Sequence, residues 1–307
     1  MRYASASAFR AALEASINRT AARDARSIQH LRKMAVFERL LARLAVVAPE
    51  RWVVKGGVAL DLRLGDRARA TRDLDLARDD AEAAAMEDLL AATEHDLGDF
   101  FVFTAERTSA LDRDREQAAV RYHVRAELAG RRFEEIALDI GFGDPLPASP
   151  DHLPGPGIFT FAELPPITVP TLPLEQHIAQ KLHAYTRAYA EGRPSTRVKD
   201  LIDMVLIRSA AAFNAGRLRE ELARTFAARG THDLPIALPP PPEDWTVPYR
   251  ALALEVGLDP ELACGHALAA SLLDRVLAGL LDAAVTWSAS EEQWLPAGDG
   301  QQQDVGQ

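Results

Sequence analysis

Two aspartates that alternate with leucines are the residues in this sequence whose spacing first suggests chemistry. Asp73 and Asp75 stand two positions apart in a short apolar stretch, and residues at i and i+2 of a β-strand point to the same side. Carboxylate oxygens so placed suit Mg²⁺, which proteins commonly hold with one or two carboxylates together with substrate phosphates. The pair is therefore a candidate metal site, although an Asp-x-Asp pattern alone is common by chance.

A lysine and two glycines precede this pair in the chain. Lys55-Gly56-Gly57 indicates a tight turn, which follows a short apolar strand at 52–54 and leads into a short helix at 58–64. Glycines at the start of a helix let backbone N–H groups approach an anion closely, and the helix dipole favours phosphate there. The turn is therefore a candidate phosphate-binding site.

Asp139 is the third acidic residue of interest, because it lies inside the apolar stretch Ile136–Ile140. A carboxylate there is costly unless it is paired or bound to a metal. If its strand lies beside the strand of Asp73 and Asp75, three carboxylates meet at one edge of a sheet, as two-metal phosphoryl transfer requires. The alternative is that Asp139 only caps the end of its strand before the glycine turn that follows.

Charged residues of the C-terminal half form another group. Lys181 lies beside the buried stripe of an amphipathic helix, from which it could project into a cleft. Asp200 and Asp203, three positions apart on the next helix, share one side of that helix. The alternative for this second helix is a solvated surface, on which Lys199 and Asp203 form an ion pair that contributes little.

A sheet and several helices must position these residues, and the hydrophobic pattern predicts both. The expected helices lie at 6–47 (two helices), 80–93, 173–189, 196–208, 214–228 and 260–284. The expected strands, beyond those at 52–54 and 73–76, lie at 100–105, 118–127, 132–140 and, as an edge strand, near 158–161. The turn Ala129-Gly130 is expected to join two of these strands as a hairpin.

The order of these elements predicts an α+β protein. Residues 1–165 are expected to contain the N-terminal helices and the core with its sheet, and residues 166–290 a helical C-terminal domain. The proline-rich segment 145–173 forms the connection between them. Residues 291–307 are polar and rich in Gln, which favours a disordered tail.

The composition limits the class of protein. Hydrophobic residues make up 48% of the 307 residues and charged residues 26%, as in globular proteins with a buried core. No stretch approaches the ~18 uncharged apolar residues of a membrane span, so no membrane partner is expected. The single cysteine cannot form an internal disulfide, which favours a cytoplasmic protein. A net charge of −10 argues against a surface built throughout to bind nucleic acid, but it allows a local basic cleft.

These motifs, in this order, resemble the nucleotidyltransferase toxins of the AbiEii/AbiGii family, a branch of the DNA polymerase β-like superfamily. The resemblance spans about residues 50–210. The matching stretches are Lys55-Gly56-Gly57-x-Ala59-Leu60, Thr71-Arg72-Asp73-Leu74-Asp75-Leu76, Leu138-Asp139-Ile140, Lys181-Leu182-x-Ala184 and Arg197-x-Lys199-Asp200-x-x-Asp203. The combined pattern is far more specific than any one of its members.

The resemblance implies a fold and an activity. The expected fold is a small mixed β-sheet of the polymerase β-like type, with N-terminal helices and a C-terminal helical domain. Such enzymes use Mg²⁺ or Mn²⁺ to transfer a nucleoside monophosphate from an NTP to an acceptor hydroxyl, and they release pyrophosphate. Characterised relatives are toxins that a cognate antitoxin protein neutralises, and several extend the 3′ end of tRNA so that it can no longer be charged.

The resemblance also assigns roles to residues. It places the metal ions on Asp73, Asp75 and Asp139, and it gives the same three residues, with Lys181 and Asp203, to catalysis. Lys181 would neutralise the triphosphate, and Asp203 or Asp200 would position Lys181 or the nucleotide. The residues expected to bind the nucleotide are Lys55, Gly56, Gly57, Lys181, Arg197, Lys199 and Asp200.

Two further positions concern phosphate binding and regulation. Val58 stands where the family usually has Ser or Thr, whose hydroxyl contacts phosphate, so nucleotide affinity is expected to be weaker or the phosphate pose different. Thr71 lies two residues before Asp73, and a phosphate there would repel the phosphates of an NTP and disturb the metal site. Some relatives are silenced by modification at this position.

Three hypotheses follow for the acceptor. The first is an RNA acceptor, which predicts a basic cleft with Arg63, Arg67, Arg69, Arg72, Arg187, Arg193, Arg197 and Lys199 as candidates. The second keeps the chemistry but transfers to a protein hydroxyl or a small molecule such as an antibiotic, which the acidic composition fits equally well. The third is a binding protein with a decayed site, which the retained carboxylates and Lys181 argue against. The sequence identifies neither the preferred NTP nor the oligomeric state.

Overall fold

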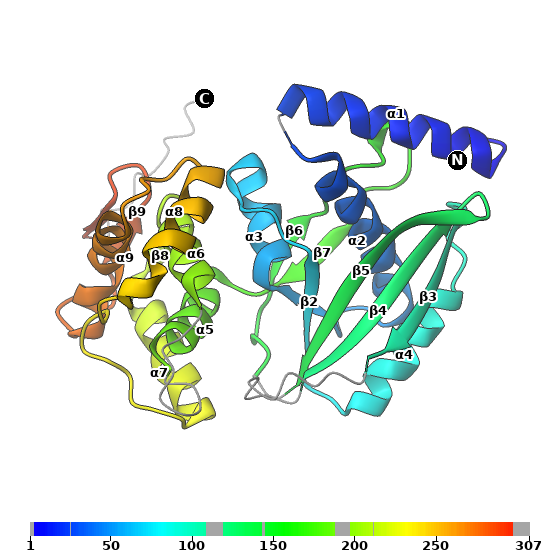
Figure 1. Ribbon diagram of the computed structural model, residues 1–307. Helices are drawn as coiled ribbons and strands as arrows, with labels where there is room; N and C mark the ends of the chain where they lie inside the picture. Colours follow the sequence, from blue (N-terminus) through cyan, green and yellow to red (C-terminus); the bar gives the residue numbers. More distant parts are fainter. Residues whose placement is uncertain are drawn as a thin grey trace, which may run out of the picture. The chain divides into compact units, whose positions relative to one another are not determined.

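The computed structural model describes residues 3–24, 26–108, 119–142, 145–187, 197–210 and 212–296 of the chain. The chain divides into two compact units, Met1–Pro173 and Leu174–Gln307. Each unit contains its own helices and its own sheet (Figure 1).

Seven strands among the described residues of the first unit form one mixed sheet. In the order in which they lie side by side, they are β3 (Phe101–Arg107), β4 (Ala119–Leu128), β5 (Arg131–Phe142), β2 (Asp73–Arg78), β1 (Val53–Lys55), β7 (Thr168–Thr171) and β6 (Asp151–Pro154). β2 runs parallel to β5 and β1 runs parallel to β7, whereas the other neighbouring strands are antiparallel. The predictions of an α+β fold and of a mixed sheet are therefore confirmed.

Helices cover one face of this sheet because its strands alternate in polarity. The helices of the first unit are α1 (Ala6–Asp24), α2 (Ile28–Val47), α3 (Gly56–Leu64) and α4 (Glu82–Glu94). α2 and α4 pack side by side against the sheet (Figure 1). Leu74 and Leu76 of β2 lie in the same buried cluster as Leu138 and Ile140 of β5 and the apolar residues of these helices. The intervening acidic residues of β2 and β5 consequently lie on the opposite face.

The proline-rich segment differs from its prediction. Residues near 158–161 form no strand: Thr160–Ala162 is a 3-10 turn, and the strands of this segment are β6 and β7. Both strands are short and contain proline, so they lack the alternation by which strands are recognised. Because β7 pairs with β1, the first unit extends to Pro173, whereas the sequence placed the boundary after residue 165.

Helices dominate the second unit. They are α5 (Leu174–Thr186), α6 (Val198–Arg208), α7 (Ala215–Arg229), α8 (Thr246–Glu255) and α9 (Leu262–Leu277). α5 packs against α6 and α7, and α6 packs against α8 and α9. A small sheet in the order β10-β9-β8 completes the unit, with strands β10 (Gln293–Leu295), β9 (Thr286–Ser288) and β8 (Phe213–Asn214).

The small sheet corrects the prediction of a disordered tail that begins at residue 291. Residues 293–295 pair with β9, and Trp294 is buried there against Trp287. Polar neighbours concealed this strand in the sequence. Residues 297–307 lie outside the described part of the chain. Within the described part, none of the helices is long and apolar enough to span a membrane.

Candidate active site

A row of four charged residues crosses the polar face of the first unit's sheet. Lys55 of β1 is opposite Asp75 of β2, Asp75 is opposite Asp139 of β5, and Asp139 is opposite Arg121 of β4. Residues that lie opposite one another on neighbouring strands point to the same face. The register therefore brings two of the predicted carboxylates side by side and places one cation at each end of the row.

Asp139 and Arg121 form a two-pronged ion pair. Arg121 Nε donates to Asp139 Oδ1 at 2.7 Å, and Nη2 donates to Oδ2 at 2.8 Å. Nη2 also lies 3.8 Å from Oδ2 of Asp73, so the guanidinium faces two of the three acidic residues. The hydrogen bond from Arg121 to Asp139 is the main cause that raises the pKa of Arg121, and the charges of Asp73 and Asp75 add to it. Arg121 therefore stays protonated.

The glycine turn lies against the second aspartate of β2. A Cβ atom on Gly56 would lie 2.8 Å from Asp75 Cγ and closer still to its Oδ2. Gly56 has a φ of +62° and begins α3, which has no side-chain cap at its N-terminus. Only glycine therefore allows the backbone at the start of α3 to lie beside the Asp75 carboxylate, where the helix dipole also stabilises negative charge.

The second glycine makes room for Thr71. A Cβ atom on Gly57 would lie 2.6 Å from Thr71 Oγ1. The Thr71 hydroxyl donates to the backbone carbonyl of Asp73 at 3.2 Å, and the side chain is buried. Thr71 therefore lies at the entry into β2 beside the start of α3, and its regulatory role stays a prediction.

Val58 points away from this face. Its side chain is fully buried and belongs to the apolar cluster beneath the sheet. A Ser or Thr in the same orientation would direct its hydroxyl into the core. The prediction that phosphate binds at this turn therefore depends on backbone N–H groups and not on the side chain at position 58.

The donor set of β2 fits a divalent cation. Asp73 and Asp75 offer hard carboxylate oxygens on one face, and the Asp73 side chain is 43% exposed. Asp139 differs, because its side chain is 4% exposed and both its oxygens accept hydrogen bonds from Arg121. No group of three or more His, Cys, Asp or Glu residues in the described ranges has the geometry of a metal site. The assignment of Asp139 as a metal ligand stays a prediction.

The second unit contains a buried cluster around Lys181. Its Nζ donates to Asp200 Oδ1 at 3.1 Å and to Asp203 Oδ2 at 2.5 Å, and all three side chains are buried. The alternative of a solvated helix surface is therefore wrong for these two aspartates. Arg197 and Lys199, at the start of α6, the helix that carries both aspartates, are exposed. That this cluster and the aspartates of β2 serve the same nucleotide stays a prediction.

The candidate basic residues differ in their surroundings. Arg63 is nearly buried and serves the fold, because it donates to Asp151 at 2.6 Å and to the carbonyl of Leu172 at 2.8 Å. Arg67 and Arg72 are exposed on the segment between α3 and β2. Arg72 directly precedes Asp73. Arg193 lies outside the described residues.

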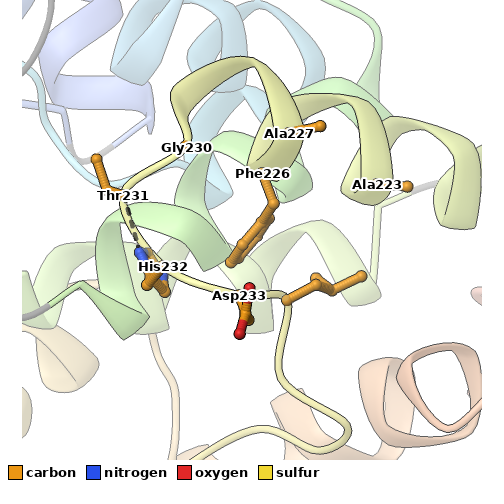
Figure 2. Close-up of a pocket in the computed structure, with 8 residues that line it drawn as sticks. Ala223, Phe226, Ala227, Gly230, Thr231, His232 and Asp233 are labelled. Atoms are coloured by element: carbon orange, nitrogen blue, oxygen red, sulfur yellow. Dashed lines mark hydrogen bonds between the residues drawn. The ribbon is translucent and has the colours of Figure 1, made fainter.

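An open hollow of about 590 Å³ occurs at the end of α7 (Figure 2). His232 lies within it, and its Nδ1 is 2.9 Å from the hydroxyl of Thr231. The residues that line it are Ala223, Phe226, Ala227, Gly230, Thr231, His232, Asp233 and Leu234. These lining residues include none of the predicted site residues, and the motifs give no signal for this hollow.

Comparison with protein-family models identifies one family, and solved structures show a similar fold. The sequence matches the family described as nucleotidyl transferase AbiEii toxin, type IV toxin–antitoxin system, over residues 39–278. The structure resembles that of MenT4, a nucleotidyltransferase toxin from Mycobacterium tuberculosis, with 18% identity, a TM-score of 0.56, and coverage of 88% of this chain and 90% of that one. It also resembles JHP933 from Helicobacter pylori, with 19% identity, a TM-score of 0.48, and coverage of 83% of this chain and 95% of that one.

No curated protein matches the chain by sequence. The match to the family nevertheless covers the glycine turn, the three aspartates of the sheet and the Lys181 cluster. The family implies an NTP substrate and an antitoxin partner. The chain belongs to the AbiEii family of type IV toxin–antitoxin toxins and is a nucleotidyltransferase.

Proposed function

We propose that this nucleotidyltransferase uses Mg²⁺ or Mn²⁺ to transfer a nucleoside monophosphate from an NTP to the 3′ end of tRNA, which blocks translation and growth. The observation that carries the proposal is the position of Asp75. It lies opposite Asp139 on the neighbouring strand and directly against Gly56 of the glycine turn. Carboxylates and a helix N-terminus thus occur together, two features that suit transfer from a triphosphate.

In this reaction an oxygen of the acceptor hydroxyl attacks the α-phosphorus of the NTP. The bond from that phosphorus to the bridging oxygen of the β-phosphate breaks, pyrophosphate leaves and the hydroxyl proton passes to a base or to water. A divalent cation on Asp73 and Asp75 would bind the phosphates and lower the pKa of the hydroxyl when it is present. The binding of phosphate oxygens is assigned to N–H groups at the start of α3, whose N-cap makes no side-chain hydrogen bond.

The Lys181 cluster supports binding of the nucleotide. A buried lysine between two buried carboxylates has its position fixed, since both partners are also held inside the unit. Such a cation can contact a triphosphate in one defined place, with less loss of side-chain entropy than a surface lysine. We assign the binding of the phosphates to Lys181 and the positioning of its ammonium group to Asp200 and Asp203.

Exposed cations before β2 support an RNA acceptor. Arg67 and Arg72 are exposed and stand within a few residues of Asp73, where they could contact the phosphates of a polynucleotide. The net charge of −10 favours the alternative of a protein hydroxyl or a small molecule as acceptor. The antitoxin that the family implies would be the protein partner.

The test is a transfer assay in which the purified chain receives Mg²⁺, total tRNA and each α-labelled NTP in turn. Asp73→Ala and Lys181→Ala are the inactive variants, and Asp79→Ala, which changes an exposed aspartate just beyond β2, is the matched control. Label in tRNA that both inactive variants lose and the control keeps would support the proposal and identify the preferred NTP. Label in protein or in a small molecule, and not in tRNA, would contradict the RNA acceptor and support the alternative acceptor.

A second arm examines the acceptor site. Arg67→Glu combined with Arg72→Glu is expected to raise the KM for tRNA and to leave the KM for NTP unchanged, because electrostatic contacts with RNA phosphates are removed. The difference in the KM for tRNA between this double variant and wild type should decrease as the salt concentration rises. An unchanged KM for tRNA would remove these arginines from the acceptor site.

A further inference from the structure

Arg121 is a residue that the motifs do not include, yet it lies among the acidic residues of the site. It comes from β4, and its guanidinium donates to both oxygens of Asp139 at 2.7 and 2.8 Å. The same group lies 3.8 Å from Asp73. A positive charge therefore already lies where three carboxylates would otherwise repel one another.

The ion pair of Arg121 and Asp139 has two parallel hydrogen bonds, which is a stronger arrangement than a single one. A planar guanidinium that meets a carboxylate with two parallel hydrogen bonds gains both energy and fixed geometry. Asp139 is almost fully buried, so removal of the Arg121 guanidinium would be costly at this position. Arg121 is 35% exposed, so part of its side chain is accessible to solvent while Nε and Nη2 hold Asp139.

This pairing conflicts with a metal ion on Asp139. A Mg²⁺ ligand lies at roughly 2.0–2.1 Å from the ion, and an ion at either oxygen of Asp139 would face the guanidinium at short range. Two cations on one carboxylate repel each other, and the repulsion is screened little at a buried group. Arg121 and a metal ion would therefore compete for Asp139.

We propose that Arg121 is the permanent cationic partner of Asp139 and takes the place of a second divalent ion. The site then binds a single divalent cation through Asp73 and Asp75. Arg121 is a positioning residue, because its two hydrogen bonds hold the Asp139 carboxylate in place beside Asp75. The inference rests on the proposed metal-dependent transfer at this face, and it replaces the ligand role that the family resemblance implies for Asp139.

The test counts bound ions instead of measuring turnover. The full-length protein is titrated with Mn²⁺ in the presence of a non-hydrolysable NTP analogue, and bound Mn²⁺ is quantified by the electron paramagnetic resonance signal of the free ion. Wild type is expected to bind one Mn²⁺, and Asp75→Asn to lose it. Arg121→Gln is expected to bind two, because the guanidinium no longer repels a cation at Asp139, and Arg121→Gln with Asp139→Asn is expected to return to one.

Two controls keep the result interpretable. Arg125→Gln changes another, exposed arginine of β4 on the same face, which pairs with the half-buried Glu135, and it is expected to leave the count at one. Arg121→Lys keeps the charge but cannot form both hydrogen bonds, and it should also bind one ion. Circular dichroism and the melting temperature of each variant establish that it is folded.

The outcomes separate this inference from the proposed function. Two Mn²⁺ ions on wild type, with one lost in Asp139→Asn, would overturn the inference and leave metal-dependent transfer intact. A folded Arg121→Gln variant that still binds one ion would also overturn it. Wild type that binds no Mn²⁺ with the NTP analogue would overturn both.

Discussion

Gly56 and Asp75 are packed so closely that a side chain on the glycine has no room. The Cβ atom of any other residue at position 56 would lie 2.8 Å from Asp75 Cγ and closer to its carboxylate oxygen. Gly56 also has a φ of +62°. The same residue therefore meets two separate requirements, one of backbone conformation and one of space beside the carboxylate.

These two requirements can be separated by a matched pair of variants. Gly56→Ala is expected to cost ~1–2 kcal/mol through its positive φ and more through contact with Asp75, and to reduce nucleotidyl transfer. Gly65→Ala is the control, because Gly65 has a φ of +60° but nothing within 4 Å of its would-be Cβ. Urea unfolding and the transfer assay measure both effects. Equal losses of stability and activity in the two variants would contradict the role of the close approach.

Much of the site could be predicted because it follows local rules. The alternation of Asp73 and Asp75 with buried leucines determines which face of β2 they occupy. Ala129 and Gly130 both have positive φ, as a tight hairpin requires, and they join β4 to β5 as expected. Helical spacing likewise predicted that Asp200 and Asp203 share one side of α6, whereas their link to Lys181 of α5 was implied by the family resemblance.

The partner of Asp139 could not be predicted from the turn alone. Counting outward from the Leu128↔Arg131 pair places Val120 opposite Asp139, because paired residue numbers keep a constant sum in a regular hairpin. A bulge shifts the register between Ala126 and Glu127, and it places Arg121 there instead. Since the extra residue lies inside a continuous strand, no turn residue or proline marks it.

The polarity of the strands shows in retrospect why the bulge is needed. In the unshifted register the acidic Asp139 would share a face with the buried Val120, and Leu138 would be opposite Arg121. One extra residue in β5 restores apolar pairs on the helix-covered face and charged pairs on the other. The short strands β6 and β7 had no comparable signal, because proline interrupts their pattern.

Substitution of Val58 tests whether the usual family residue could act at this position. Val58→Thr is expected to lower the free energy of unfolding by ~1–3 kcal/mol, because a hydroxyl enters the apolar cluster. The KM for NTP should not improve, since the side chain points away from the site. Denaturant unfolding and steady-state kinetics measure both quantities. A lower KM for NTP in Val58→Thr would show that the hydroxyl reaches phosphate.

We predict that the enzyme keeps its activity with another small hydroxyl residue at position 71 but loses it with a negatively charged one. Thr71→Glu places a carboxylate beside Gly57 and Asp73, where it repels the carboxylates and the NTP phosphates, so transfer should be lost. Thr71→Ser keeps the hydroxyl that donates to Asp73 and should retain activity. Transfer assays and NTP binding are measured for both. Full activity of Thr71→Glu would exclude control of the site by a phosphate at this residue.

The end of β2 gives a prediction about pH. Arg78 donates to Asp80, Arg51 contributes further, and together they hold the pKa of Asp80 below its usual 3.8. Because the folded pKa is depressed, this contribution to stability is present above pH 3.8 and is lost as the pH falls through the folded value. Asp80→Asn should therefore cost about 1 kcal/mol at pH 7, a figure that partial exposure keeps modest.

That loss should shrink at pH 3, because this is below the usual pKa of 3.8 and the Asp80 carboxylate of the unfolded chain is then largely protonated. The neighbouring Asp79 is exposed, and Asp79→Asn is the control, with little change expected at either pH. Guanidinium unfolding at the two pH values measures the difference between variant and wild type. A loss in Asp80→Asn that is equally large at pH 3 would show that the charge on Asp80 is not its source.

Lys181 is predicted to contribute to both stability and chemistry, and a second substitution separates the two. Lys181→Met leaves Asp200 and Asp203 buried without their cation, which should cost ~3–5 kcal/mol and abolish transfer. Lys181→Met combined with Asp203→Asn removes one of the uncompensated charges, so the double variant should regain part of the stability. It should regain no transfer, because the cation for the triphosphate is still absent.

The control for this pair is Lys199→Met, which changes an exposed lysine on the next helix and should alter stability by no more than about 0.5 kcal/mol. Chemical unfolding gives the free energies, and α-labelled NTP gives the transfer rates. Recovery of transfer together with stability in the double variant would mean that Lys181 only holds the second unit together. Recovery of stability alone would place its ammonium group in contact with the nucleotide.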